Sequence, residues 1–222
     1  MSEPWYLQEP IVNSYESWYE GKGKRADILE KELLKELLDC VGPVKTMLEV
    51  GVGTAHFARW FESFGIQCVG LDFSHIMLKE AKKLWNGHLI RGDAHHLPFR
   101  EKTFDLTAFI TCMEYMHSPT DVLREASRVS ERGILWGIMN RWSLPTIRRW
   151  IQVALGRNPF YSNAHFYSIR DARKFIRNAL DKIDYTMKWS TTVYPRPLLV
   201  RKSRIPLGAF LVVAVKFTSS GG

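Results

Sequence analysis

An apolar segment that leads into two closely spaced glycines constrains the fold of this chain more than any other feature. Residues 44–50 have the composition of a buried strand, Gly51 and Gly53 follow with one residue between them, and a helical pattern begins at once. A strand that enters a helix through a glycine turn places backbone N–H groups beside a ligand. Glu49 precedes the turn, and its carboxylate repels a pyrophosphate but suits a ligand with positive charge or hydroxyl donors.

The spacing after these glycines argues against a nicotinamide dinucleotide. The dinucleotide fingerprint Gly-x-Gly-x-x-Gly needs a third glycine where this chain has His56. The run Glu49-x-Gly51-x-Gly53-x-Ala55 instead resembles the first motif of the class I S-adenosylmethionine-dependent methyltransferases. That motif usually has a third glycine at the position of Ala55.

A second sequence motif follows at Asp72, which ends an apolar strand 21 residues after Gly51. At this spacing a βαβ unit brings an acid to a ribose, and a carboxylate can accept hydrogen bonds from both ribose hydroxyls. Ser74 is suited to cap the next helix. Phe73 and Met77 are expected to wall the adenine base.

Two further sequence motifs strengthen the resemblance, which covers residues 44–138. Gly92-Asp93-Ala94 followed by Leu97-Pro98-Phe99 matches the loop after the third strand. In that family the acid or its neighbouring backbone meets the adenine amino group, which places Asp93 there. The strand 104–110 then runs into a loop at Thr111, under the cofactor.

The resemblance implies S-adenosylmethionine as methyl donor and S-adenosylhomocysteine as product. It implies that backbone of the glycine turn approaches the methionine part, and that Glu49 lies near its amino group or sulfonium. The cofactor residues expected are Glu49, Gly51, Gly53, Thr54, Asp72, Phe73, Ser74, Met77, Asp93, Ala94 and Thr111.

Alternating strand and helix patterns predict an α/β fold. Strands are expected at 44–50, 67–72, 88–91, 104–110 and 132–139, with helices at 54–64, 74–85 and 120–129. This alternation favours a parallel sheet covered on both faces. We expect a Rossmann-like three-layer α/β/α sandwich with a seven-strand, mostly parallel sheet. Strands at 184–194 and 207–217 complete it, with 195–206 as a turn, and the resemblance implies that the last strand is antiparallel between its neighbours.

The chain is expected to form a single domain over residues 1–222, with a helical N-terminal cover (1–43) and an inserted cap over a substrate cleft (141–167). In the cover, the run Asn13-Ser14-Tyr15-Glu16 suggests a helix cap with an acid at the third helical position, and a second helix is expected at 26–41. In the insert, residues 141–155 form an amphipathic basic pattern. Such a helix can lie on lipid or place its apolar face over the cleft, which is the interpretation favoured here. Ser168 and Asp171 predict a further capping box, which opens a helix to residue 180.

The formal net charge of +8 is unevenly distributed. Residues 1–140 contain 16 Lys/Arg and 20 Asp/Glu, a charge of −4, whereas residues 141–222 contain 15 and 3, a charge of +12. This asymmetry suits anions, nucleic acid or a membrane surface, or simply keeps the chain in solution. No stretch reaches the ~18–20 apolar residues of a membrane span. Three scattered cysteines suggest a reducing compartment, so we expect a cytoplasmic protein.

No side chain stands out as a catalytic base. His117 and His165 are candidates, because an imidazole can take a proton near neutral pH, although each could equally be a loop histidine. Candidate substrate contacts are Tyr15, Tyr19, Asn140 and Tyr161. His95 and His96 lack a third ligand with convincing spacing, so no metal is expected.

Three functions remain in competition. The first is transfer of a methyl group to a small-molecule acceptor, anionic acceptors included, by in-line displacement at a sulfonium. The second keeps the cofactor and takes RNA or another polyanion as acceptor, which the +12 part of the chain suggests. The third is a regulator that binds S-adenosylmethionine without turnover, because no base is obvious.

Overall fold

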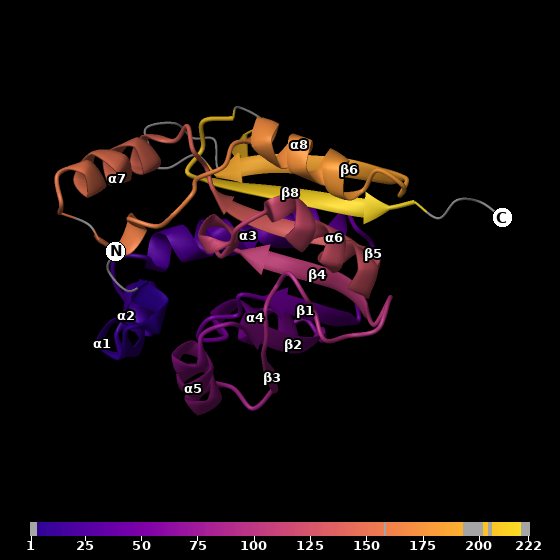
Figure 1. Cartoon of the computed structure of the whole chain (residues 1–222), viewed down its shortest axis with the longest axis horizontal. Coiled ribbons are helices and arrows are strands. Elements are labelled where there is room, and N and C mark those ends of the chain that lie inside the picture. The colour runs from indigo at the N-terminus through magenta and orange to yellow at the C-terminus, as the bar shows by residue number, and fades with distance from the viewer. Residues whose placement is uncertain (1–3, 158, 193–201, 204–205, 219–222) are drawn as a thin grey trace.

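The computed structural model describes residues 4–157, 159–192, 202–203 and 206–218, and its centre is one mixed β-sheet (Figure 1). The strands lie in the order β3-β2-β1-β4-β5-β8-β6-β7. Their bounds are β1 (Thr46–Val50), β2 (Gln67–Asp72), β3 (His88–Arg91), β4 (Phe104–Ile110), β5 (Ser130–Met139), β6 (Tyr185–Thr192), β7 (Lys202–Ser203) and β8 (Phe210–Phe217).

The first five strands are parallel, and β8 is antiparallel to both of its neighbours, β5 and β6. This confirms the expected Rossmann-like sheet with its last strand inserted in reverse. The seven expected strands are all present. A two-residue eighth strand, β7, pairs with the edge of β6 inside the segment that we expected to be only a turn. Residues 195–201 and 204–205 of that turn lie outside the described residues.

Helices cover both faces of the sheet. They are α1 (Glu9–Asn13), α2 (Tyr15–Glu20), α3 (Lys24–Asp39), α4 (His56–Glu62), α5 (His75–Leu84), α6 (Pro119–Val129), α7 (Leu144–Ala154) and α8 (Ile169–Ala179), with short 3-10 turns η1 (Trp5–Leu7), η2 (Met113–Tyr115) and η3 (Pro159–Tyr161). One apolar core lies between the sheet and α3, α4 and α5, and the other between the sheet and α6 and α8. The three-layer sandwich is therefore confirmed.

Two of the three predicted helix caps are confirmed. The Ser74 hydroxyl accepts a hydrogen bond from Met77 N at the start of α5, and Ser168 and Asp171 form a complete capping box on α8. The predicted cap in the run from Asn13 to Glu16 is wrong. Asn13 is the last residue of α1, and Ser14, which precedes α2, makes no side-chain capping bond and donates its hydroxyl to the Ile11 carbonyl.

The orientation of α7 also differs from our expectation. The predicted apolar face, which includes Ile147, Ile151 and Leu155, is exposed instead of covering a cleft. The only fully buried side chain of α7 is the small polar Thr146. The shape of the neighbouring chain decides which face turns inward, and helical periodicity does not contain that information.

Candidate active site

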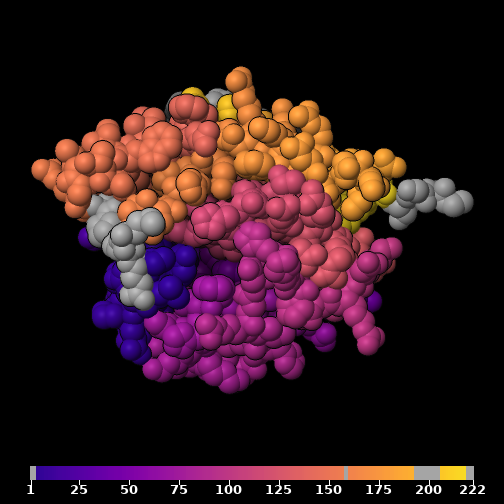
Figure 2. All heavy atoms as spheres, viewed as in Figure 1, coloured from indigo at the N-terminus to yellow at the C-terminus, as the bar shows by residue number. Residues whose placement is uncertain are grey.

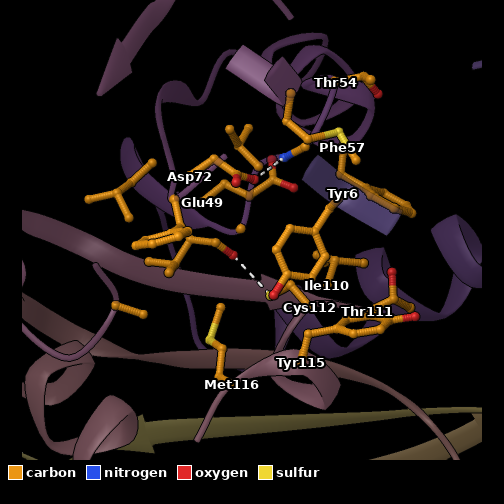
Figure 3. Close-up of a pocket in the computed structure, with 18 of the residues that line it drawn as sticks. Tyr6, Glu49, Thr54, Phe57, Asp72, Ile110, Thr111, Cys112, Tyr115 and Met116 are labelled. Atoms are coloured by element: carbon orange, nitrogen blue, oxygen red, sulfur yellow. Dashed lines mark hydrogen bonds between the residues drawn. The ribbon is translucent and has the colours of Figure 1, made fainter. Parts of the chain in front are cut away.

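A cavity of about 340 Å³ opens at the carboxyl ends of β1, β2 and β4 (Figure 3). This volume lies within the range of small-molecule sites. Parallel sheets of this kind bind ligands at this edge. The expected cofactor residues that line the cavity are Glu49, Gly51, Gly53, Thr54, Asp72, Phe73, Met77, Asp93, Ala94 and Thr111.

The glycine turn fits tightly between two strands. Gly51 N and Val52 N both donate to the Leu71 carbonyl, at 2.7 and 3.1 Å. Gly51 has φ +70°, and a Cβ there would lie 2.5 Å from Cys112 Cβ. Only glycine meets both conditions, since it has no Cβ and adopts positive φ without strain.

Ala55 adopts the left-handed conformation, with φ +63°, at the N-cap of α4. This is the position where the resembling motif has its third glycine. Left-handed backbone costs an alanine about 1–2 kcal/mol. Its buried methyl group packs in the core under α4, and this burial offsets about 0.8 kcal/mol of that cost.

Asp72 links the turn to the second strand. Its Oδ2 accepts from Gly53 N at 2.8 Å and its Oδ1 accepts from Ser74 N at 2.8 Å. A carboxylate has about four acceptor positions, so each oxygen retains one for a ligand hydroxyl. Burial raises the pKa of Asp72, and the backbone donors oppose that shift. Ser74 does not line the cavity; it caps α5 and donates to the Tyr6 carbonyl.

Glu49 carries an unsatisfied acceptor at the cavity. Its side chain is 2% exposed, and Oε2 has no hydrogen-bond partner among the described residues. Burial, followed by the charge of Asp72 beside it, raises the pKa of Glu49 well above its ordinary value (Figure 3). A buried unpaired acceptor costs about 1–3 kcal/mol. A ligand that brings a hydrogen-bond donor or a cation to Glu49 removes this cost.

Asp93, His95 and His117 line the first cavity and are linked to one another by hydrogen bonds. Asp93 Oδ1 accepts from His95 N at 2.9 Å and from His95 Nδ1 at 2.7 Å, and His95 Nε2 donates to the His117 carbonyl at 2.7 Å. Both ring nitrogens of His95 therefore face acceptors, as in an imidazolium. Burial lowers the pKa of His95, but these contacts outweigh it and the pKa is raised.

A second cavity, of about 740 Å³, adjoins the first. Both are lined by the same wall of five side chains, namely Trp5, Tyr15, Tyr19, Thr111 and Tyr115. The second cavity extends to Pro145 and Arg149 of α7 and to Phe160 and Tyr161 of η3.

The shared wall is held by ring contacts and one strained residue. Trp5 stacks between Tyr15 and Phe160, with ring centroids 5.2 and 4.1 Å apart. Thr111 has φ +51°, a conformation that costs a non-glycine residue of order 1–3 kcal/mol and is concentrated at functional sites.

Two predicted site residues lie away from both cavities. Asn140 is buried, and its Nδ2 donates to the carbonyls of Pro206 and Gly208, so it fixes the loop before β8. The His165 side chain is exposed, and its backbone N donates to the Glu114 carbonyl. Tyr15, Tyr19 and Tyr161, by contrast, all line the second cavity.

The N-terminal helices are fastened over the glycine turn by a polar network that the sequence did not reveal. The Glu16 carboxylate accepts from the Thr54 hydroxyl and from Arg59 Nη2, the latter at 2.9 Å. His56 Nε2 lies 2.7 Å from Asp27 Oδ1. Trp5 and Tyr6, which line the first cavity, were not predicted from the sequence. The many aromatic residues among the first 19 were the sequence feature that could have indicated them.

Comparison with known proteins identifies the class. The sequence profile described as "Methyltransferase domain" matches residues 48–136. An uncharacterized protein of Methanocaldococcus jannaschii is 29% identical over 171 residues, which cover 76% of this chain and 78% of that protein. A solved structure from Thermotoga maritima, described as a methyltransferase and possible histamine N-methyltransferase, has a TM-score of 0.78 at 26% identity and covers 96% of this chain and 98% of its own.

The demethylmenaquinone methyltransferase of Thermotoga maritima is 37% identical over 100 residues, 44% of this chain and 43% of that enzyme. Residues 48–136 therefore form a methyltransferase domain of the class I S-adenosylmethionine-dependent type, and S-adenosylmethionine is the methyl donor.

The residues of the first cavity fit this donor. The unpaired Glu49 oxygen suits its ammonium group, the free acceptor positions of Asp72 suit its ribose hydroxyls, and Met77 and Phe73 offer apolar surface to its base. Within the described ranges, no group of three or more His, Cys, Asp or Glu side chains could hold a metal ion. No helix in the described part of the chain is long and apolar enough to cross a membrane.

Proposed function

We propose that this protein transfers the methyl group of S-adenosylmethionine to a small-molecule acceptor bound in the second cavity. The supporting observation is the wall common to both cavities, at Trp5, Tyr15, Tyr19, Thr111 and Tyr115. Residues that line both cavities frame the place where the cavities meet, and a donor and an acceptor in direct contact there can be aligned for in-line displacement. Such alignment can lower a barrier by about 7–11 kcal/mol in favourable cases.

The donor supplies a methyl group on a sulfonium, which is already an activated leaving group. The protein's task is therefore to hold and align. We assign donor binding to Glu49, to Asp72 and to the backbone of the glycine turn. His117, which lines the first cavity and whose carbonyl is held by His95, is the proposed proton acceptor for a nucleophile that reaches from the second cavity into the first.

The aromatic lining of the second cavity favours a small acceptor over RNA. Eight aromatic side chains line the second cavity, namely Trp5, Tyr15, Trp18, Tyr19, Tyr115, Phe160, Tyr161 and Phe210. Such a surface suits an apolar or aromatic molecule more than a phosphate backbone. The names of the two Thermotoga maritima relatives, a demethylmenaquinone and a possible histamine methyltransferase, also refer to small acceptors.

The test combines binding with turnover. Isothermal titration with S-adenosylmethionine and S-adenosylhomocysteine should give saturable binding, and absence of binding at millimolar donor would overturn the proposal. Release of S-adenosylhomocysteine is then measured with a panel of amines, phenols, quinols and thiols, and with RNA as a separate arm. Turnover with RNA alone would favour the polyanion alternative, and binding without turnover on any acceptor would favour a regulator.

A further inference from the structure

Exposed apolar side chains are concentrated on one segment of this protein. Twelve large hydrophobic residues are exposed in the described chain, and six of them lie between residues 142 and 155, in and beside α7. They are Trp142, Leu144, Ile147, Trp150, Ile151 and Leu155. Soluble surfaces rarely collect such residues in one place unless something binds there.

These side chains form a continuous stripe. Leu144, Ile147, Ile151 and Leu155 follow the spacing of one helical face, and Leu144 and Leu155 are 73% and 60% exposed. On the other face Thr146 is buried, and Pro145 and Arg149 line the second cavity. The helix thus turns its polar side to the protein and its apolar side outward. Figures 1 and 2 show it at the periphery of the molecule.

The segment that carries the stripe has only positive charges. Residues 141–157 contain four arginines and no acidic residue, and one of them, Arg141, pairs with Asp171 at 3.3 Å. Arg148 lies beside the stripe on the helix, is exposed, and makes no ion pair with another described residue. Its long stem can lie along an apolar phase while its guanidinium reaches anionic groups.

The combination of features selects among possible occupants. A second copy of the chain, with its own charge of +8, would bring two basic faces together. A nucleic acid would leave the leucine and isoleucine side chains unused. An anionic lipid surface accommodates all three elements, because leucine and isoleucine enter the acyl boundary, tryptophans lie at the headgroup level, and arginines meet the phosphates.

We propose that α7 docks this protein onto anionic lipid surfaces through its outward apolar stripe and the arginines beside it. Because Pro145 and Arg149 of the same helix line the second cavity, docking would bring the rim of that cavity to the lipid. An acceptor dissolved in the membrane could then enter without crossing water.

The test uses the full chain and vesicles. Co-sedimentation is measured with phosphatidylcholine vesicles and with vesicles that also contain phosphatidylglycerol. The double variant Ile147→Glu/Ile151→Glu removes the centre of the stripe, and Leu84→Glu makes the same kind of change at an exposed site on α5. Arg148→Glu tests the charge. Thermal unfolding checks that each variant is folded.

We expect binding to the anionic vesicles only, weakened more than about tenfold in the double variant and at least about fivefold in Arg148→Glu, with Leu84→Glu unchanged. Absence of vesicle binding, or equal binding by the double variant, would overturn the proposal. So would a dimer that the double variant abolishes, since the occupant would then be a second copy. Calorimetric binding of S-adenosylmethionine in solution is measured in parallel, so loss of docking and loss of donor binding are distinguished.

Discussion

Tyr19 stacks on His56, with ring centroids 3.6 Å apart and planes 11° from parallel. The contact joins the N-terminal cover to the first turn of α4, beside the donor cavity. The same imidazole lies between two carboxylates, Asp27 at 2.7 Å and Glu16 at 3.8 Å. The cover is therefore fastened by a residue that titrates near neutral pH.

The first prediction is a pH window for this fastening. Burial lowers the pKa of His56, but the bonds to Asp27 and Glu16 outweigh it and raise the pKa above 6.5. Because the pKa of His56 is higher in the folded than in the unfolded state, its contribution to the stability of the fold is complete below pH 6.5. This contribution is lost as the pH rises through the pKa of the folded state. Burial raises the pKa of Glu16, yet bonds from His56, Thr54 and Arg59 bring it from 4.5 to about 2. That contribution is full above 4.5 and is lost as pH falls.

The cover should therefore be most stable between pH 4.5 and 6.5. Thermal unfolding of wild type and His56→Gln across pH checks this. Their difference should be largest inside the window and should shrink above it. His75→Gln, at an exposed site on α5, is the control, and an equal pH profile for both variants would contradict the assignment.

The second prediction concerns donor affinity. Asp72→Ala removes the acceptor proposed for the ribose hydroxyls, and each hydrogen bond to a charged group contributes about 1.5–3 kcal/mol. The affinity for S-adenosylmethionine should fall at least about tenfold in calorimetric titration. Asp121→Ala, at an exposed site on α6, should leave it unchanged. An unaltered Kd in Asp72→Ala would remove Asp72 from the site.

The third prediction separates strain from collision at the glycine turn. Gly51→Ala combines positive φ with a Cβ 2.5 Å from Cys112, whereas Gly65→Ala has φ +80° and open space around the new methyl group. Urea unfolding should show a loss of about 1–2 kcal/mol for Gly65→Ala from backbone strain alone. Gly51→Ala should lose clearly more. Equal losses would mean that Cys112 moves aside without cost.

The fourth prediction compares two tryptophans. Trp5 lines both cavities and Trp18 lines only the second. Trp5→Ala should weaken binding of S-adenosylhomocysteine about tenfold, because a buried aromatic contact is worth about 1.5 kcal/mol or more. Trp18→Ala should leave this binding unchanged and lower turnover only. A similar loss of affinity in both variants would argue against two separate subsites.

Much of this architecture could be predicted because local patterns determine it. The periodicity of apolar residues predicted the five parallel strands. Gly51, Asp72 and Asp93 could be placed at one edge of the sheet, because the carboxyl ends of parallel strands lie at the same edge. The capping box at Ser168 needs only residues within one helical turn. These features depend on short stretches of sequence.

The failures share one physical cause, which is that tertiary packing decided them. The run from Asn13 to Glu16 has a capping sequence, but α1 continues through Asn13 and the Ser14 hydroxyl bonds back to the Ile11 carbonyl. Asn140 was expected at the substrate, yet it satisfies two carbonyls of a loop more than sixty residues away. The outward face of α7 could not be predicted, since periodicity identifies a stripe and not the direction in which it points.

The reversed insertion of β8 between β5 and β6 has a consequence for synthesis on the ribosome. Neither neighbour can complete its ladder until β8 has left the exit tunnel. Helix α3 contacts β5, β6 and β8, so this helix cannot complete its packing against the sheet until the late strand has emerged. The nascent protein therefore passes through translation with one face of α3 uncovered, and chaperones would be expected to meet that face there.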